Sequence, residues 1–149
     1  MIIPSEVECE HICLYGEYLD SGASRDVFTH EDYPGIVVKV VREGEDMWGN
    51  QNDREVQNYK WLMNQRLPSF IKVPKTVKVG QYVVQEFVEG KHPPEHGYDE
   101  WGNEIPCECF DSLGLPYCWE VETSQYNGDA HSGNVMLVGK TVYMIDLGV

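Results

Sequence analysis

The stretch that most constrains the fold lies near the end of the sequence and reads Val135-Met-Leu-Val138, Gly139-Lys140, Thr141-Val-Tyr-Met-Ile145. Two apolar, β-branched runs separated by a two-residue turn that contains glycine are typical of a β-hairpin. With this turn fixed, the predicted facing pairs are Val138 with Thr141, Met136 with Tyr143, and Asn134 with Ile145. Asn134 and Asp146 are therefore expected to lie together at the open end of the hairpin.

A third polar residue, Asp129, precedes Asn134 by five positions in the loop 127–133 and is expected to join this cluster. Carboxylate and amide oxygens are hard ligands that suit Mg²⁺. The pattern makes Asn134 and Asp146 candidate metal ligands, and it makes Asp129 a candidate for orienting or deprotonating a hydroxyl. Asp and Asn are also ordinary turn formers and caps, and the residues alone leave this second interpretation open.

Upstream, the run Ile36–Val41 lies between Pro34-Gly35 and Glu43-Gly44 and is predicted to be a β-strand. Both of its faces are largely apolar, which indicates a strand that is covered on each side. Lys39 is the exception. A lysine in such a strand either extends to solvent or has an anionic partner.

The next segment, Asn52–Arg66, is predicted to be a helix that is capped by Asn52 or Asp53. Its apolar positions are Val56, Tyr59 and Met63. Glu55 falls on the apolar side of this helix, where a carboxylate is unexpected.

Two further strands, Thr76–Val79 and Tyr82–Val88, are predicted to form a hairpin around Gly80-Gln81. The segment Lys91–Pro116 is rich in proline and glycine and is predicted to be a loop, which at this length is either functional or a hinge. For Tyr117–Tyr126 the pattern fits both helix and strand, and we favour a helix.

The chain has 149 residues, 42% of them hydrophobic, and a net charge of −14 from 25 acidic and 11 basic residues. This composition predicts one globular domain, and the excess of acids argues against a general nucleic-acid surface. No apolar run approaches the roughly 20 residues of a membrane span, and Met1–Glu10 lacks the basic start of a signal peptide. Five cysteines, an odd number, favour a reduced, cytoplasmic protein.

Several motifs together resemble the protein-kinase-like superfamily, in the version of the aminoglycoside phosphotransferases and atypical kinases. Asp129-Ala-His-Ser-Gly-Asn134 and Ile145-Asp-Leu-Gly148 resemble its catalytic and metal-binding loops. Gly22-Ala-Ser-Arg-Asp-Val-Phe28 resembles a phosphate-covering loop, and Val83-Val-Gln-Glu-Phe-Val-Glu-Gly90 resembles the hinge that contacts adenine. The resemblance covers roughly Leu19–Val149, with the motifs in family order.

The resemblance implies a single α+β domain over residues 1–149 with the protein-kinase-like fold. Residues 1–90 would form an antiparallel sheet with one helix, and residues 91–149 would form a reduced C-terminal lobe with the catalytic hairpin. The implied cofactors are ATP and Mg²⁺. The implied catalytic residues are Asp129, Lys39 and Glu55, with Glu55 pairing with Lys39. The implied ATP-binding residues are Gly22, Ser24, Lys39, Glu86 and Val88, and the implied metal ligands are Asn134 and Asp146.

The function that this resemblance implies is ATP-dependent phosphotransfer, and we expect a protein serine or threonine as acceptor. Three departures leave an alternative open. The phosphate loop has only Gly22, Asn127 stands where the family commonly has histidine, and the sequence stops at Val149 without the usual helical lobe. The alternative is a weak or inactive kinase-like binding module or inhibitor that blocks a host or partner protein through its acidic surface.

Two groups of cysteines are candidate zinc ligands: Cys107, Cys109 and Cys118, and Cys9 and Cys13 with His11. Neither group has the paired C-x₂-C spacing of a structural zinc site. Ordinary buried or surface thiols are therefore the favoured interpretation. His92 and Glu95 are likewise expected to be solvated loop residues.

Overall fold

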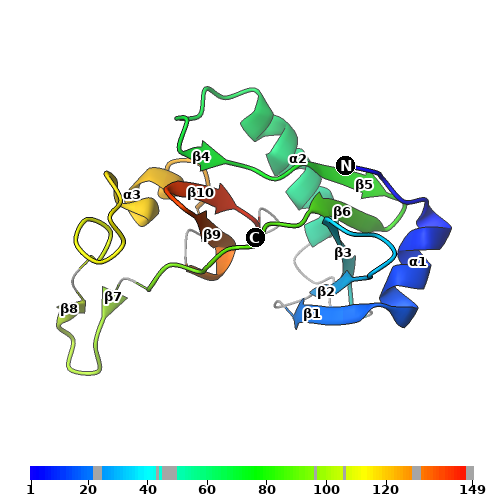
Figure 1. Ribbon diagram of the computed structural model, residues 1–149, viewed down its shortest axis with the longest axis horizontal. Helices are drawn as coiled ribbons and strands as arrows, with labels where there is room; N and C mark the ends of the chain where they lie inside the picture. The colour runs from blue at the N-terminus through cyan, green and yellow to red at the C-terminus, as the bar shows by residue number, and fades with distance from the viewer. Residues whose placement is uncertain are drawn as a thin grey trace. The chain divides into compact units, whose positions relative to one another are not determined.

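The computed structural model describes residues 1–21, 25–42, 44, 50–95, 97–105, 107–128 and 132–146. The chain is divided into two units, the first formed by Met1–Gln65 with Pro74–Val88 and the second by Arg66–Val73 with Glu89–Asp146. The fold is mixed α+β, with an antiparallel sheet and few helices (Figure 1). None of the described helices has the length and apolar character that a membrane span needs.

The first unit contains a five-stranded sheet in the order β1-β2-β3-β6-β5, with every neighbouring pair antiparallel. Its strands are β1 (Glu17–Ser21), β2 (Arg25–Thr29), β3 (Ile36–Val41), β5 (Thr76–Val79) and β6 (Tyr82–Glu86). The predicted bounds of β3 and β5 are confirmed, whereas β6 ends two residues earlier than predicted. Gly80 in the β5–β6 turn has φ of +57°, a conformation that favours glycine.

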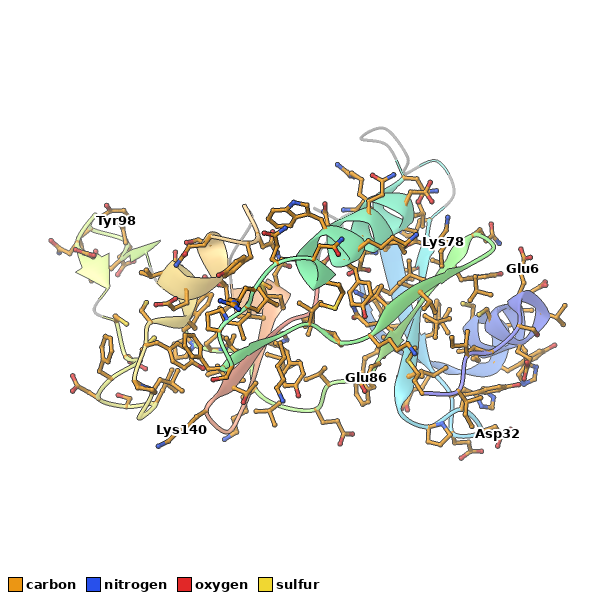
Figure 2. The ribbon with its side chains drawn as sticks, turned by 90° about the horizontal axis from the view of Figure 1, so that it is seen from above. Glu6, Asp32, Lys78, Glu86, Tyr98 and Lys140 are labelled. Carbon is orange, nitrogen blue, oxygen red and sulfur yellow. The ribbon has the colours of Figure 1, made fainter. Side chains whose placement is uncertain are left out.

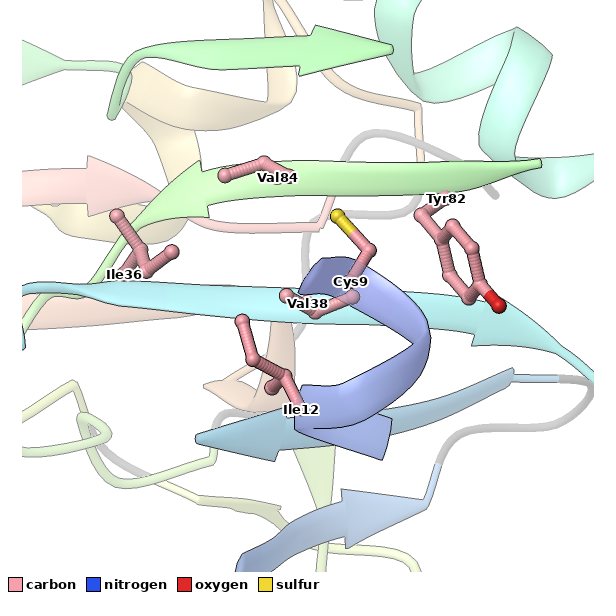
Figure 3. Close-up of a cluster of buried hydrophobic side chains, with 6 residues drawn as sticks. All are labelled: Cys9, Ile12, Ile36, Val38, Tyr82 and Val84. Atoms are coloured by element: carbon pink, nitrogen blue, oxygen red, sulfur yellow. The ribbon is translucent and has the colours of Figure 1, made fainter. Parts of the chain in front are cut away.

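Helix α1 (Glu6–Tyr15) covers one face of this sheet and was not predicted, so the single N-terminal helix of the sequence analysis is wrong. Its Cys9 and Ile12 pack against Ile36, Val38 and Val84 in a buried cluster (Figure 3). The helix is short and its apolar residues are not confined to one side, since Val7 and Leu14 are exposed, so its apolar periodicity is weak. The signal that could have found it is a capping box, in which Ser5 and Glu8 hydrogen-bond each other's backbone N–H groups.

The Glu8 carboxylate of this capping box gives a testable pH dependence. The backbone N–H of Ser5, and after it the Tyr33 hydroxyl, lower the pKa of Glu8 from its ordinary value of 4.5. A carboxyl group with a lowered pKa stabilises the fold above its unfolded pKa and loses this effect as the pH falls. We expect Glu8→Gln to reduce the thermal midpoint at pH 7, and the deficit to shrink between about pH 5 and pH 3. The exposed Glu10→Gln is the matched control, and a deficit for Glu8→Gln that does not change with pH would contradict the assignment.

Helix α2 (Gln51–Met63) covers the opposite face of the sheet, where it contacts β3, β5 and β6. Its N-cap is Asn50 rather than the predicted Asn52 or Asp53, because the Asn50 side chain accepts the backbone N–H groups of both residues. The side chains that it buries include Val56 and Leu62, and Asn52 and Glu55 are completely buried beside them. An ion pair from Lys78 of β5, which is labelled in Figure 2, to Asp53 adds a link at the surface.

The second unit is built around the predicted C-terminal hairpin, β9 (Val135–Val138) with β10 (Thr141–Met144). The predicted pairs Val138–Thr141 and Met136–Tyr143 are confirmed. An unpredicted short strand, β4 (Ile71–Lys72), adds to β10 in parallel. The remaining elements are β7 (Gly97–Tyr98), β8 (Glu104–Ile105), α3 (Trp119–Ser124) and the 3₁₀ turn η1 (Ser132–Asn134). Helix α3 confirms the helical interpretation of its segment.

Candidate functional site

Lys39 and Glu55 form a buried ion pair between β3 and α2. The Lys39 Nζ lies 3.1 Å from Oε1 and 3.0 Å from Oε2 of Glu55, and the two side chains are 6% and 0% exposed. Strand alternation turns Lys39 toward α2, and the helix places Glu55 on its buried side. The contact that the resemblance implies between these two residues is therefore present, and it holds the amine in one place.

Two residues that sequence reasoning did not assign to the site, Arg25 and Asn52, belong to the same network. The guanidinium of Arg25 lies 2.8 Å from Glu55 Oε1 and 3.1 Å from Asn52 Oδ1. The Asn52 amide donates to the carbonyl of Lys39 at 3.1 Å and to that of Gln81 at 2.8 Å. Asn52 therefore ties the start of α2 to β3, while Arg25 and Lys39 contact the same carboxylate from two neighbouring strands.

The sequence contains a pattern that could have identified each of Arg25 and Asn52. Val27 of β2 pairs with Lys39, and Arg25, two residues earlier, lies on the same face of the sheet as Val27. Asn52 precedes Glu55 by three positions, so the two share a face of the helix. The argument for Arg25 needs the pairing of β2 with β3, whereas the argument for Asn52 needs only the helix.

Of the other predicted ATP-binding residues, Glu86 and Val88 are among the residues that the structure describes. Glu86 is exposed at the end of β6 and its backbone N–H donates to the carbonyl of Lys75 at 2.9 Å (Figure 2). Val88, two residues on, is half-buried. Gly22 and Ser24 lie outside the described residues. Because the Glu86 N–H already donates to Lys75, an adenine base bound at this segment would need another backbone N–H as its hydrogen-bond donor.

In the second unit, the two predicted metal ligands lie at the open end of the hairpin. The backbone N–H of Ile145 donates to the carbonyl of Asn134 at 2.9 Å, as the predicted facing of these residues requires. The Asn134 side chain is buried, and Asp146 follows Ile145 directly and is half-buried. Asp129, the predicted catalytic aspartate, lies outside the described residues.

Asn127, which stands where the resemblance would place a histidine, has a structural role in this region. Its side-chain amide donates to the backbone carbonyl of Asp146 at 3.1 Å. The bond joins the residues that directly follow β10 to Asn127. Asn127 is itself buried, so water competes little for this hydrogen bond.

His92 and Glu95 are exposed, as expected, and both also form hydrogen bonds to the segment of the η1 turn. The His92 Nδ1 lies 2.9 Å from the carbonyl oxygens of both Ser132 and Val135. Because both partners are acceptors, this nitrogen must carry the proton. The Glu95 carboxylate accepts from the Ser132 hydroxyl and backbone N–H. These bonds span about forty residues of sequence, so no local pattern predicts them.

Among the described residues, one group of three side chains has ligand atoms close enough together to hold a metal ion. The group consists of Cys107, Cys109 and Cys118. The alternative group of Cys9, Cys13 and His11 is not brought together in this way. Cys9 lies on the buried side of α1, where burial raises the pKa of its thiol to about 11. Burial also raises the pKa of Cys13 to about 12. Both thiols stay protonated and pack as apolar groups.

No family model and no curated protein matches the chain. Two solved structures of the aminoglycoside phosphotransferase APH(2")-IIa, a streptomycin–ATP ternary complex and a gentamicin complex, are 23% and 24% identical to it. Each covers 61% of this chain with a TM-score of 0.41, and the chain spans 31% and 30% of their lengths.

A third solved structure, the complex of Rv3197 with erythromycin from Mycobacterium tuberculosis, is 12% identical. It covers 96% of this chain, which spans 51% of the Rv3197 chain, and the TM-score is 0.56. This likeness shows a shared fold over nearly the whole of the chain.

Proposed function

We propose that this chain binds ATP with Mg²⁺ and transfers phosphate to a hydroxyl group, in the manner of the protein-kinase-like enzymes. The observation that carries the proposal is the buried Lys39–Glu55 pair. Removing a lysine and a glutamate from water is costly, and an apolar pair of similar volume would often stabilise the sheet equally well. A fixed amine at this position is useful when it must contact a phosphate, because phosphoryl transfer depends on positioned positive charge.

The roles follow from the chemistry of each group. Lys39 would contact the α- and β-phosphates, with Glu55 holding its amine in position. Asn134 and Asp146 offer an amide and a carboxylate oxygen, which suits Mg²⁺, an ion that keeps several waters and binds few protein oxygens. The ion would neutralise charge on the phosphates, which matters in a chain of net charge −14. Asp129 would accept the proton of the attacking hydroxyl or orient it.

Nucleotide binding is tested by thermal shift and calorimetry with ATP in the presence and absence of MgCl₂. We expect ATP with Mg²⁺ to stabilise the protein, and we expect Asp146→Asn to weaken this binding at least about tenfold, since it removes a charged ligand. Asp111→Asn, at an exposed position, is the matched control. If millimolar ATP with Mg²⁺ gives no shift in the wild-type chain, the proposal fails and the acidic binding module is favoured.

For the acceptor we propose a protein serine or threonine. The similar solved structures contain streptomycin, gentamicin and erythromycin, so these compounds are the natural competitors in an assay. ATP labelled in its γ-phosphate is incubated with the protein and either a cell lysate or each antibiotic. Label on proteins that depends on Asp129 supports the proposed acceptor, whereas label on an antibiotic alone overturns it.

A further inference from the structure

We propose that Cys107, Cys109 and Cys118 form a zinc site in the second unit. Their sulfur atoms all lie within 4.8 Å of one another, although the third comes from a position eleven residues after the first. Cys107 and Cys109 belong to the loop that follows β8, and Cys118 immediately precedes α3. The site is independent of the residues assigned to ATP and Mg²⁺.

The distance between two of the three sulfurs matches the geometry that zinc requires. The Sγ atoms of Cys107 and Cys118 lie 3.8 Å apart. Tetrahedral zinc with Zn–S bonds of about 2.3 Å places its sulfur ligands about 3.8 Å from one another. The same 3.8 Å is much longer than a disulfide bond of about 2.05 Å. The two thiols, which are in hydrogen-bond contact in this structure, therefore lie at the separation that two ligands of one zinc ion would have.

A backbone N–H group near the sulfurs donates the kind of hydrogen bond that metal-bound thiolates usually accept. The N–H of Cys109 donates to the Cys107 sulfur at 3.4 Å, a contact that stabilises a thiolate and orients it toward a metal. Cys109 is fully buried and Cys107 is exposed, so the site has an inner and an outer side.

Three thiolates and a water on the exposed side would complete four-coordination. Binding replaces three thiol protons with one zinc ion, so three protons are released. The ion and its three thiolates together carry a net charge of −1. Zinc needs no redox partner for this step, whereas a disulfide would need an oxidant and would use only two of the three sulfurs.

A metal ion bound by these cysteines would also help to keep the segment between β8 and α3 in one conformation. From residue 107 to residue 118 the backbone forms turns, closed by bonds such as Leu115 N–H to the Cys109 carbonyl at 2.8 Å. The side chains of Leu115, Tyr117 and Trp119 are nevertheless buried. In a unit this small, an ion that joins the loop to the start of α3 would supply constraint that the apolar core alone provides weakly.

The test measures zinc in the full chain, expressed in zinc-supplemented medium and purified without chelators. We expect about one zinc per chain in the wild type and below about 0.1 in Cys107→Ser and Cys118→Ser. Cys13→Ser, which changes a thiol of the first unit, should keep the ion. Cys107 is exposed, so its variant is expected to fold, and circular dichroism checks this.

Cobalt provides a second readout, because Co²⁺ held by thiolates in a tetrahedral site absorbs visible light strongly. Apoprotein with added Co²⁺ should gain this absorption, and the Cys107 and Cys118 variants should not. Wild-type protein that holds no zinc after reconstitution would overturn the proposal, as would full zinc in Cys107→Ser. An intact mass lower by about 2 Da in fresh protein would also overturn it, since it would reveal a disulfide instead.

Discussion

Replacing Glu55 with alanine is expected to lower the free energy of unfolding by about 3–5 kcal/mol, an effect large enough to unfold many domains of this size. The Glu55 carboxylate is completely buried and is contacted by both Lys39 and Arg25. Truncation removes the negative charge while two cations remain in the same low-dielectric surroundings, and it leaves a cavity between α2 and β3. Urea denaturation followed by circular dichroism measures the change.

Two further variants separate the effect of losing the buried Glu55 charge from the general effect of replacing a glutamate in a helix. Glu10→Ala, at an exposed position of α1, should change stability by no more than about 0.5 kcal/mol. Glu55→Gln preserves the volume and one acceptor oxygen, so its cost should fall between those of the two alanine variants. A loss below about 1 kcal/mol for Glu55→Ala would show that the ion pair contributes little to the fold.

The second large effect concerns the proposed reaction. Lys39→Met should lower the rate of phosphoryl transfer about 100- to 1,000-fold, because it removes a preorganised positive charge from the phosphates. Methionine is similar in length and apolar, so the strand retains its packing. The measurement is initial rate with labelled ATP on the acceptor identified from lysate, at saturating nucleotide.

Lys39→Arg provides the sharper comparison. Arginine can keep a charged contact with Glu55, so stability should stay closer to the wild type than in Lys39→Met, while the altered position of the charge should still reduce transfer. Lys60→Met, an exposed substitution on α2, should leave the rate unchanged. Full activity in Lys39→Met would remove this lysine from the mechanism, whatever the nucleotide affinity.

The parts of the fold that the sequence predicted are those with strong local signals. The hairpin of β9 and β10 follows from two apolar runs and a glycine turn, and its register follows from the turn alone. Strand β3 follows from a β-branched run, and Lys39 was identified because it is the one charged residue within it. Glu55 was found in the same way, as a carboxylate on the buried side of a helix.

The parts that were missed depend on contacts between distant segments. Strand β4 has two residues and no pattern of its own, and it exists because it pairs with β10 about seventy positions later. Arg25 and Asn52 enter the network only through the pairing of β2 with β3 and the docking of α2. The sulfur cluster was discounted because its spacing in sequence differs from that of paired motifs, whereas turns between the ligands bring the sulfurs together.

The placement of β4 has a consequence for how this chain reaches its native state during synthesis. The first unit has all five strands of its sheet once residue 86 has left the ribosome, so it can fold while translation continues. Ile71 and Lys72 must wait for the β10 residues Val142 and Tyr143, which are made about seventy residues later. A nascent chain that stalls before residue 142 would therefore leave Ile71 and Lys72 without the strand that pairs with them.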